Sequence, residues 1–298
     1  MKKNTLTLTV IANMTSNYGE GLGNISSVQK VFRNGKVYSM RSRESLKNAI
    51  MTQSGMYDDL QTESNGATQK RVNKELNATN CRALEGGYMN TKEATLIRKS
   101  SFYLTDAIAT ESFVNETRFH NNLHLATNFA NLNNINLQEK ASDCGLMPYQ
   151  YEYDKSLKTY SITIDLDMIG TDDNFKFEEG YEEASAEEKI ARVNSILDTI
   201  ENLSLTVKGN LDNAEPIFVV GGFSDRKTHY FENVVNVKNN KLVLSQDLKY
   251  KVGKGFKVAL VESDIFENQE DIKYDLNTIS VAEMFDNLRE EVANYYNK

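Results

Sequence analysis

The alternation of apolar and polar residues in "TYSITIDLDMIG" (159–170) constrains the fold more than any other feature of the chain. Apolar residues fall on one face of an extended segment and polar residues on the other, which is typical of a strand with one buried face. The apolar face holds Ile162, Ile164, Leu166 and Met168, and the polar face holds Thr163, Asp165 and Asp167. Residues 5–12 alternate in the same way, so both segments are predicted to be strands.

Helices are predicted between the strands by their capping residues. Ser42 stands at the start of an apolar-periodic segment, and capping boxes begin at Ser185 and Ser280. The predicted helices are 42–52, 185–203 and 280–296, and further strands are predicted at 36–40, within 95–109, from 216 to the glycines at 221, and within 254–263. Setting aside two irregular stretches, 57–95 and 118–158, leaves the order strand–helix–strands–helix–strand. This order predicts an α+β, ferredoxin-like or RNA-recognition-motif fold.

Charge is distributed unevenly behind a formal net charge of −8. Residues 1–57 hold eight basic residues against two acidic ones, Glu20 and Glu44, whereas 172–188 is strongly acidic. The basic residues are Lys2, Lys3, Lys30, Arg33, Lys36, Arg41, Arg43 and Lys47; the acidic ones are Asp172, Asp173, Glu178, Glu179, Glu182, Glu183, Glu187 and Glu188. Such a chain can bind a polyanion locally, and two charged faces also suit head-to-tail association. A pattern that only maintains solubility is the alternative.

The compartment is predicted from apolar runs and cysteines. No run approaches the roughly 20 apolar residues needed to cross a bilayer, so no membrane partner is expected. The basic start continues into alternating threonines and apolar residues, which indicates a strand rather than a signal peptide. Cys81 and Cys144 belong to no CxxC pair, which favours a reducing environment. We expect a cytoplasmic protein.

A dinucleotide site is not predicted from "GEGLGN", the glycine-rich loop expected after the first strand. Gly19, Gly21 and Gly23 have GxGxG rather than GxGxxG spacing, and no series of βαβ units follows.

Two candidate metal sites are also weak. Asp165 and Asp167, on one strand face, suit magnesium, but a polar sheet face explains them better. His120 and His124 have the i, i+4 spacing of zinc ligands, but no glutamate occupies the HExxH position, so we interpret them as chance histidines. We expect no metal, no cofactor and no catalytic residue.

Arg41 and Arg43 flank the capping residue Ser42, where backbone N–H groups already favour an anion. This arrangement suggests a bound phosphate or carboxylate. An N-cap serine with two solvated arginines is the alternative.

"GGFSDRKTHYF" (221–231) is the second basic candidate. Two glycines after a strand allow a ligand close to the backbone. Arg226, Lys227 and His229 offer phosphate contacts, and Phe223 and Tyr230 offer stacking surfaces. A hairpin turn with exposed side chains explains the pattern equally well.

Three stretches, in this order, resemble a known family: "GLGNISSVQK", "YSMRSRESLKNAI" and "VVGGFSDRKTHYFENVV". "LIRKSSFYLTDAIA" and "MPYQYEYDKSLKTYSITIDLDMIG" extend the likeness through nearly the whole chain. The chain resembles the backbone subunit of type I CRISPR effector complexes, in the DevR autoregulator branch found in type I-B systems and within the RAMP superfamily.

The resemblance implies a modified RNA-recognition-motif palm with a helical finger insertion and a thumb hairpin. The palm is expected at 1–56, 96–117 and 159–298, the finger at 57–95 and the thumb at 118–158. RNA-binding residues follow by matching the family's serine-containing helix start and glycine-rich loops. They are Asn24, Ser26, Lys30, Arg41, Ser42, Arg43, Ser45, Lys47, Gly221, Gly222, Phe223, Ser224, Arg226 and Lys227.

The implied function is a non-enzymatic role in CRISPR antiviral defence. Copies of the chain are expected to polymerise along CRISPR RNA in a Cascade complex and to present the guide for pairing with target DNA. The other expected partners are the large subunit and the subunit that caps the 5′ handle. The alternatives are a type III-like RNA-cleaving backbone, a metal-dependent nuclease at Asp165 and Asp167, and a plain protein-interaction domain.

Overall fold

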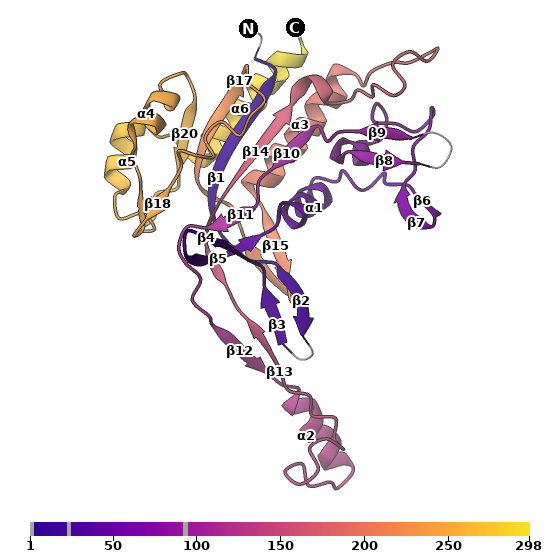
Figure 1. Cartoon of the computed structure of the whole chain (residues 1–298), viewed down its shortest axis with the longest axis vertical. Helices are drawn as coiled ribbons and strands as arrows, with labels where there is room; N and C mark the ends of the chain where they lie inside the picture. Colours follow the sequence, from indigo (N-terminus) through magenta and orange to yellow (C-terminus); the bar gives the residue numbers. More distant parts are fainter. Residues whose placement is uncertain (1–2, 23–24, 92–94) are drawn as a thin grey trace.

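A computed structural model describes residues 3–22, 25–91 and 95–298, which build a large antiparallel sheet with helices on its faces (Figure 1). The strands, in order across the sheet, are β20 (Lys257–Leu260), β17 (Pro216–Ser224), β1 (Thr5–Thr15), β14 (Lys155–Asp165), β11 (Ala107–Ala109), β5 (Lys36–Arg41) and β4 (Lys30–Arg33), and β10 (Phe102–Leu104) also pairs with β14. The chain order through the centre is β1, α1, β10, β14, α3 and β17.

Three helices cover one face of the sheet: α1 (Arg43–Gln53), α3 (Ala186–Glu201) and α6 (Val281–Tyr296). Each begins at its predicted cap. The side chains of Ser42, Ser185 and Ser280 accept hydrogen bonds from the backbone N–H three residues later. No helix in the described ranges is long and apolar enough to cross a membrane.

The main core lies between these helices and the sheet. Leu6, Leu8, Ile162 and Ile164, from the two alternating segments, are fully buried there against residues such as Leu46 of α1. Complete burial of a side chain of this size contributes about 1.5–3 kcal/mol. The strands and the burial of their apolar face are confirmed for 5–12 and 159–165, but the polar face is buried as well, at Thr7, Thr9 and Thr163.

Hydroxyl groups line part of the opposite face. Thr9 Oγ1 lies 2.7 Å from Ser161 Oγ, and Thr7 Oγ1 donates to the carbonyl of Thr228 in the loop after β17. Beside them a second apolar cluster, which includes Phe218 of β17, covers the sheet. It is formed with β18 (Val237–Lys238), β19 (Lys241–Leu242), α4 (Gln246–Val252) and α5 (Gln269–Leu276).

Two predictions about strand ends are wrong. Gly221 and Gly222 do not follow β17 but lie within it, paired with Leu8 and Thr7 of β1. Asp167 does not share a strand face with Asp165, because β14 ends at Asp165 and the chain turns into η2 (Leu166–Met168). The alternation of apolar and polar residues predicted a longer strand, because it does not show where the neighbouring strand ends.

Residues 57–91 and 95–98 form a lobe beside the sheet, called the side lobe below (Figure 1). The predicted finger, 57–95, was expected to be helical, but the described part contains no α-helix. The side lobe consists of β6 (Thr62–Asn65), β7 (Ala67–Lys70), η1 (Arg82–Gly86), β8 (Tyr88–Asn90) and β9 (Leu96–Arg98). Its small apolar cluster combines lobe residues such as Leu84 and Tyr88 with Phe175 from the segment before α3, so the lobe packs against a distant part of the chain.

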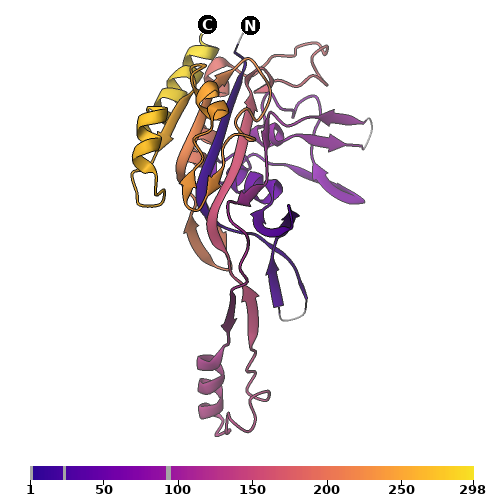
Figure 2. The same ribbon diagram turned by 60° about the vertical axis from the view of Figure 1, so that its left-hand side comes forward.

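A long arm, residues 117–152, projects away from the sheet in both views (Figures 1 and 2). It consists of β12 (Thr117–His120), α2 (Leu123–Leu132) at the tip and β13 (Tyr149–Glu152). β13 also pairs with β3 (Ile25–Val28), which pairs with β2 (Tyr18–Leu22). The stretch 118–158, expected to be irregular, is therefore structured, and Tyr18–Leu22 of the predicted glycine loop is a strand. The short hairpin β15 (Ser204–Val207) and β16 (Asn210–Asn213) completes the fold.

Glu188, at the start of α3, gives a prediction on acid stability. Two hydrogen bonds from Arg82, and one from Arg192, lower the pKa of Glu188 to about 2 from its ordinary value of 4.5. A lowered pKa in the folded state contributes stability that is present above pH 4.5 and is lost as the pH falls towards 2. We expect Glu188→Gln to flatten the fall of the urea midpoint between these pH values, measured by circular dichroism. A fall as steep as that of the parent would contradict this role.

Candidate nucleic-acid interface

The N-terminus of α1 is capped by groups of the protein itself. Ser42 Oγ accepts from the Ser45 N–H at 3.2 Å, and the Ser42 N–H donates to Asn17 Oδ1 at 2.8 Å. The Arg43 N–H donates to Asp106 Oδ1 at 2.9 Å. These backbone groups are therefore already occupied, and a ligand here depends on side chains around the helix start.

The structure separates the two arginines that flank Ser42. Arg43 is largely exposed, with its Nε 3.2 Å from Glu44 Oε1. Arg41 is only 5% exposed and donates to the carbonyl of Thr15 at 3.0 Å and to Ser45 Oγ at 2.8 Å. Burial lowers the pKa of Arg41 to about 10. Arg43 is thus available to a phosphate, whereas Arg41 joins β5 to β1 and α1.

One nitrogen of the Arg41 side chain takes no part in these contacts. Its Nη2 is buried and has no hydrogen-bond partner in the described ranges. An unpaired buried donor costs about 1–3 kcal/mol, so a small anion or water reaching this atom is favoured.

Lys47, one turn into α1, faces the side lobe. Its Nζ donates to the carbonyl of Gly86 and to Ser100 Oγ, both at 2.8 Å, and lies 4.9 Å from the ring centre of Phe102. Burial, and then the nearby charge of Lys70, lower the pKa of Lys47 to about 8. In this structure the Lys47 ammonium group is therefore used for contacts within the protein. The alternative of two solvated arginines beside Ser42 is therefore wrong for Arg41, which is buried.

In the basic segment 221–231, several side chains that the sequence suggested for RNA binding are already in contact with other parts of the protein. Lys227 forms an ion pair with Asp165, and its Nζ lies 5.2 Å from the ring centre of Tyr103. Ser224 is buried and accepts from the Arg226 N–H at 3.0 Å. The Arg226 side chain is exposed. Phe223 packs on the main core near Tyr295, and with Gly221 and Gly222 it belongs to β17.

The early candidates lie near the root of the arm. Lys30 Nζ is 2.5 Å from Glu152 Oε2, which also accepts from the Val28 N–H. Ser26 Oγ accepts from Lys208 Nζ at 3.1 Å. Asn24 lies outside the described residues.

A groove of about 990 Å³ crosses the hydroxyl-bearing face of the sheet. One wall is the β4–β5 hairpin and the other is the segment from His229 to Asn239, with Ser161 of β14 on the floor. Its basic lining comes from Arg33, Lys36, Arg43, His229 and Lys238, and its acidic lining from Asp106, Glu111 and Glu232. Arg43 connects the groove with the start of α1. A polar groove with cations on both walls can hold a phosphate backbone.

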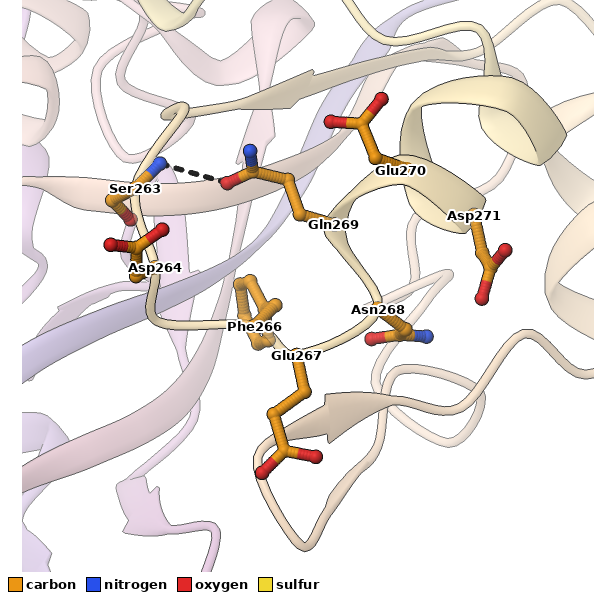
Figure 3. A pocket seen from close by; sticks show the side chains of 8 residues that line it. All are labelled: Ser263, Asp264, Phe266, Glu267, Asn268, Gln269, Glu270 and Asp271. Carbon is orange, nitrogen blue, oxygen red and sulfur yellow. Dashed lines mark hydrogen bonds between the residues drawn. The ribbon is translucent and has the colours of Figure 1, made fainter.

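A smaller hollow of about 480 Å³ lies where α5 begins (Figure 3). Asp264, Glu267, Glu270 and Asp271 line it, and the Ser263 N–H donates to Gln269 Oε1 at 2.8 Å. Four carboxyl groups disfavour a phosphate here.

The carboxylates of Asp165 and Asp167, and the rings of His120 and His124, do not come together as metal ligands. The Asp167 carboxylate accepts from Asn4 and Tyr295, whereas Asp165 pairs with Lys227. His120 is in β12 and His124 in α2, so they do not share a helix face. No cluster of three or more His, Cys, Asp or Glu side chains in the described ranges is arranged to hold a metal ion.

Sequence reasoning missed two features. The groove is formed by segments far apart in the chain, for which no local signal exists. The arm strand β13 had a signal: Tyr149, Tyr151 and Tyr153 alternate in "YQYEY", a strand pattern overlooked among the asparagines around it.

The fold and site define a mixed α+β protein with an antiparallel sheet, a projecting arm and a groove with a partly basic lining. Residues 6–243 match the family described as "CRISPR-associated negative auto-regulator DevR/Csa2". The chain belongs to this family. A search of curated proteins finds no match.

Solved structures with this fold include two chains titled as parts of a "CRISPR RNA-guided surveillance complex". The first, titled "pre-nicking", is 12% identical with a TM-score of 0.59, and the second is 14% identical with a TM-score of 0.52. Each comparison covers 97% of this chain and 99% of the other. At these identities the likeness establishes the fold alone.

Proposed function

We propose that the chain is a non-catalytic backbone subunit that polymerises along CRISPR RNA in a type I-B Cascade complex. The observation that carries the proposal is membership of the DevR/Csa2 family over residues 6–243. In this role the protein holds the guide by its phosphates, and base pairing with target DNA supplies sequence specificity. The large subunit and the 5′-handle-capping subunit complete the assembly.

The strand order supports a modified RNA-recognition-motif palm. The central strands lie in the order β17, β1, β14 and β10, and α1 and α3 pack on the same face. A β-α-β-β-α-β chain folds into this arrangement in ferredoxin-like proteins. We assign the palm to 1–56, 96–117 and 159–298, the finger to 57–95 within the side lobe, and the thumb to 118–158, which includes most of the arm.

The basic lining of the groove supports contact with RNA phosphates. Arg43 is exposed at the meeting point of the groove and α1, and Arg33, Lys36 and Lys238 extend the cationic lining. Single-stranded nucleic acid is held in such grooves largely through its backbone, with little sequence preference.

A non-catalytic role is favoured over RNA cleavage by the environment of the acidic residues. The connection between β1 and α1 holds one acidic residue, Glu20, and its remainder from residue 21 to the start of α1 contains no Asp or Glu. The Asp59 carboxylate accepts from the backbone N–H groups of Arg82 and Ala83, at 2.6 and 3.1 Å, so it caps η1. A carboxylate used in this way is poorly placed for general-base or metal chemistry.

Assembly on RNA tests the proposal directly. Light scattering should show oligomers whose mass grows with the length of added CRISPR RNA. A monomer mass that does not change with RNA at low salt would contradict it. Incubating the assembly with complementary labelled RNA and magnesium or manganese should give no cleavage, whereas regularly spaced products lost in Asp58→Ala/Asp59→Ala would favour the RNA-cleaving alternative.

Arg43 gives a quantitative prediction. If its guanidinium neutralises one phosphate, Arg43→Gln should reduce the slope of log K against log salt by about 0.7 on single-stranded RNA. Stability should change little, because the side chain is exposed. Lys176→Gln, an equal charge change on the exposed part of the acidic segment, is the matched control and should leave the slope unchanged. Equal slopes in Arg43→Gln and the parent would exclude a phosphate contact.

A further inference from the structure

Three aromatic rings gather on one face of the arm. Tyr149 and Tyr151 point to the same side of β13, and His120 lies opposite them on β12. The ring centre of His120 is 5.5 Å from that of Tyr149 and 4.9 Å from that of Tyr151, and all three planes are within 23° of parallel. His120 is exposed and Tyr149 is 46% exposed, whereas Tyr151 is buried. The rings of His120 and Tyr149 are therefore open to a ligand.

Two cations lie beside these rings, on the side of Tyr151 that faces the root of the arm. The guanidinium carbon of Arg118 lies 3.3 Å from the ring centre of Tyr153, and Arg118 also pairs with the exposed Glu116 at 3.4 Å. On the same side of the rings, Lys208 Nζ lies 4.7 Å from the ring centre of Tyr18, whose ring meets the edge of Tyr151. Cations next to open rings suit single-stranded nucleic acid, because they can contact its phosphates while its bases stack on the rings.

The aromatic face also connects with the candidate phosphate site. Tyr18 directly follows Asn17, whose side chain caps the N-terminus of α1 beside Arg43. A strand held at Arg43 can therefore continue past Tyr18 onto the arm.

We propose that His120 and Tyr149 form a platform on which unpaired bases of single-stranded RNA stack, with Tyr151 as its buried support. This inference rests on the proposed function, because it names how the arm contacts the RNA that the protein holds. The near-parallel rings offer flat surfaces to bases of any identity, so the platform adds affinity without sequence preference. A second copy of the chain is the competing occupant, and the test separates the two.

The test measures binding of a 2-aminopurine-labelled single-stranded RNA at fixed salt. The double variant His120→Ala/Tyr149→Ala should bind about tenfold more weakly, the loss of roughly one stacked base. Its salt slope should equal that of the parent, because no phosphate contact is removed. Tyr149→Phe keeps the ring and should bind as the parent does. Tyr274→Ala, at an 89% exposed tyrosine on α5, is the matched control and should have no effect.

A second measurement changes the RNA instead of the protein. Replacing bases by abasic sites keeps the phosphates, and it should lower the affinity of the parent to that of the double variant. If the parent binds RNA and neither change weakens binding, the platform is excluded and the proposed function stands. If the double variant loses only self-association without RNA, the face binds a second copy and the inference is wrong. If the parent binds no RNA, the proposed function fails and the inference with it.

Discussion

Glu85→Gln should lower the free energy of unfolding by about 3–5 kcal/mol, because it leaves two buried arginines without their full counter-charge. Glu85 is fully buried in the side lobe. Its carboxylate accepts from Arg98 Nη2 at 3.0 Å, from Arg192 Nη1 at 2.8 Å and from the Gly170 N–H at 2.7 Å. Ser101 Oγ donates to it as well. Urea unfolding followed by circular dichroism measures the loss.

The pair between Glu178 and Lys74 provides the matched control. Its atoms are 3.8 Å apart and both side chains are about half exposed. Glu178→Gln should therefore cost less than about 1 kcal/mol. If Glu85→Gln costs no more than Glu178→Gln, the buried network does not hold the side lobe to α3. This network joins η1, β9 and α3, so its loss should also change how the side lobe sits beside the sheet.

Gly221→Ala should destabilise the protein by about 3 kcal/mol or more, because a side chain has no room in the centre of the sheet. A Cβ at this position would lie 2.0 Å from the carbonyl oxygen of Thr7 and 2.9 Å from the Cα of Leu8. Both are backbone atoms of β1. That strand cannot move away, since β14 pairs with it along its whole length on the other side.

Gly19→Ala is the matched control for this substitution. Gly19 lies in β2, and the nearest atoms to an added Cβ are 3.8 Å away, which is ordinary contact. It should change the unfolding free energy by well under 1 kcal/mol. Similar losses for both variants would mean that β1 and β17 do not pack as closely as described. This prediction also gives Gly221 a packing role, which is separate from the RNA contact that the family resemblance implies for it.

The local patterns of the chain predicted local structure well. Alternation in 5–12 and 159–165 predicted two central strands, and capping serines at 42, 185 and 280 predicted the starts of three helices. These signals depend on neighbours in the sequence, through the period of the backbone and the hydrogen bonds of the first helical turn. The order of the elements, and the resemblance to the DevR branch, then led to the family.

The sequence by itself therefore determined the α+β class, the helix starts and the family, whereas the tertiary structure decided which charges are free to bind. Arg41 and Arg43 are equivalent in sequence, one on each side of Ser42. β1 and α1 bury the first, and the second stays at the edge of the groove. Burial and pairing arise when distant segments meet, as with Lys30 and Glu152 or Lys227 and Asp165. No period or motif encodes those distances, because they depend on the packing of the whole chain.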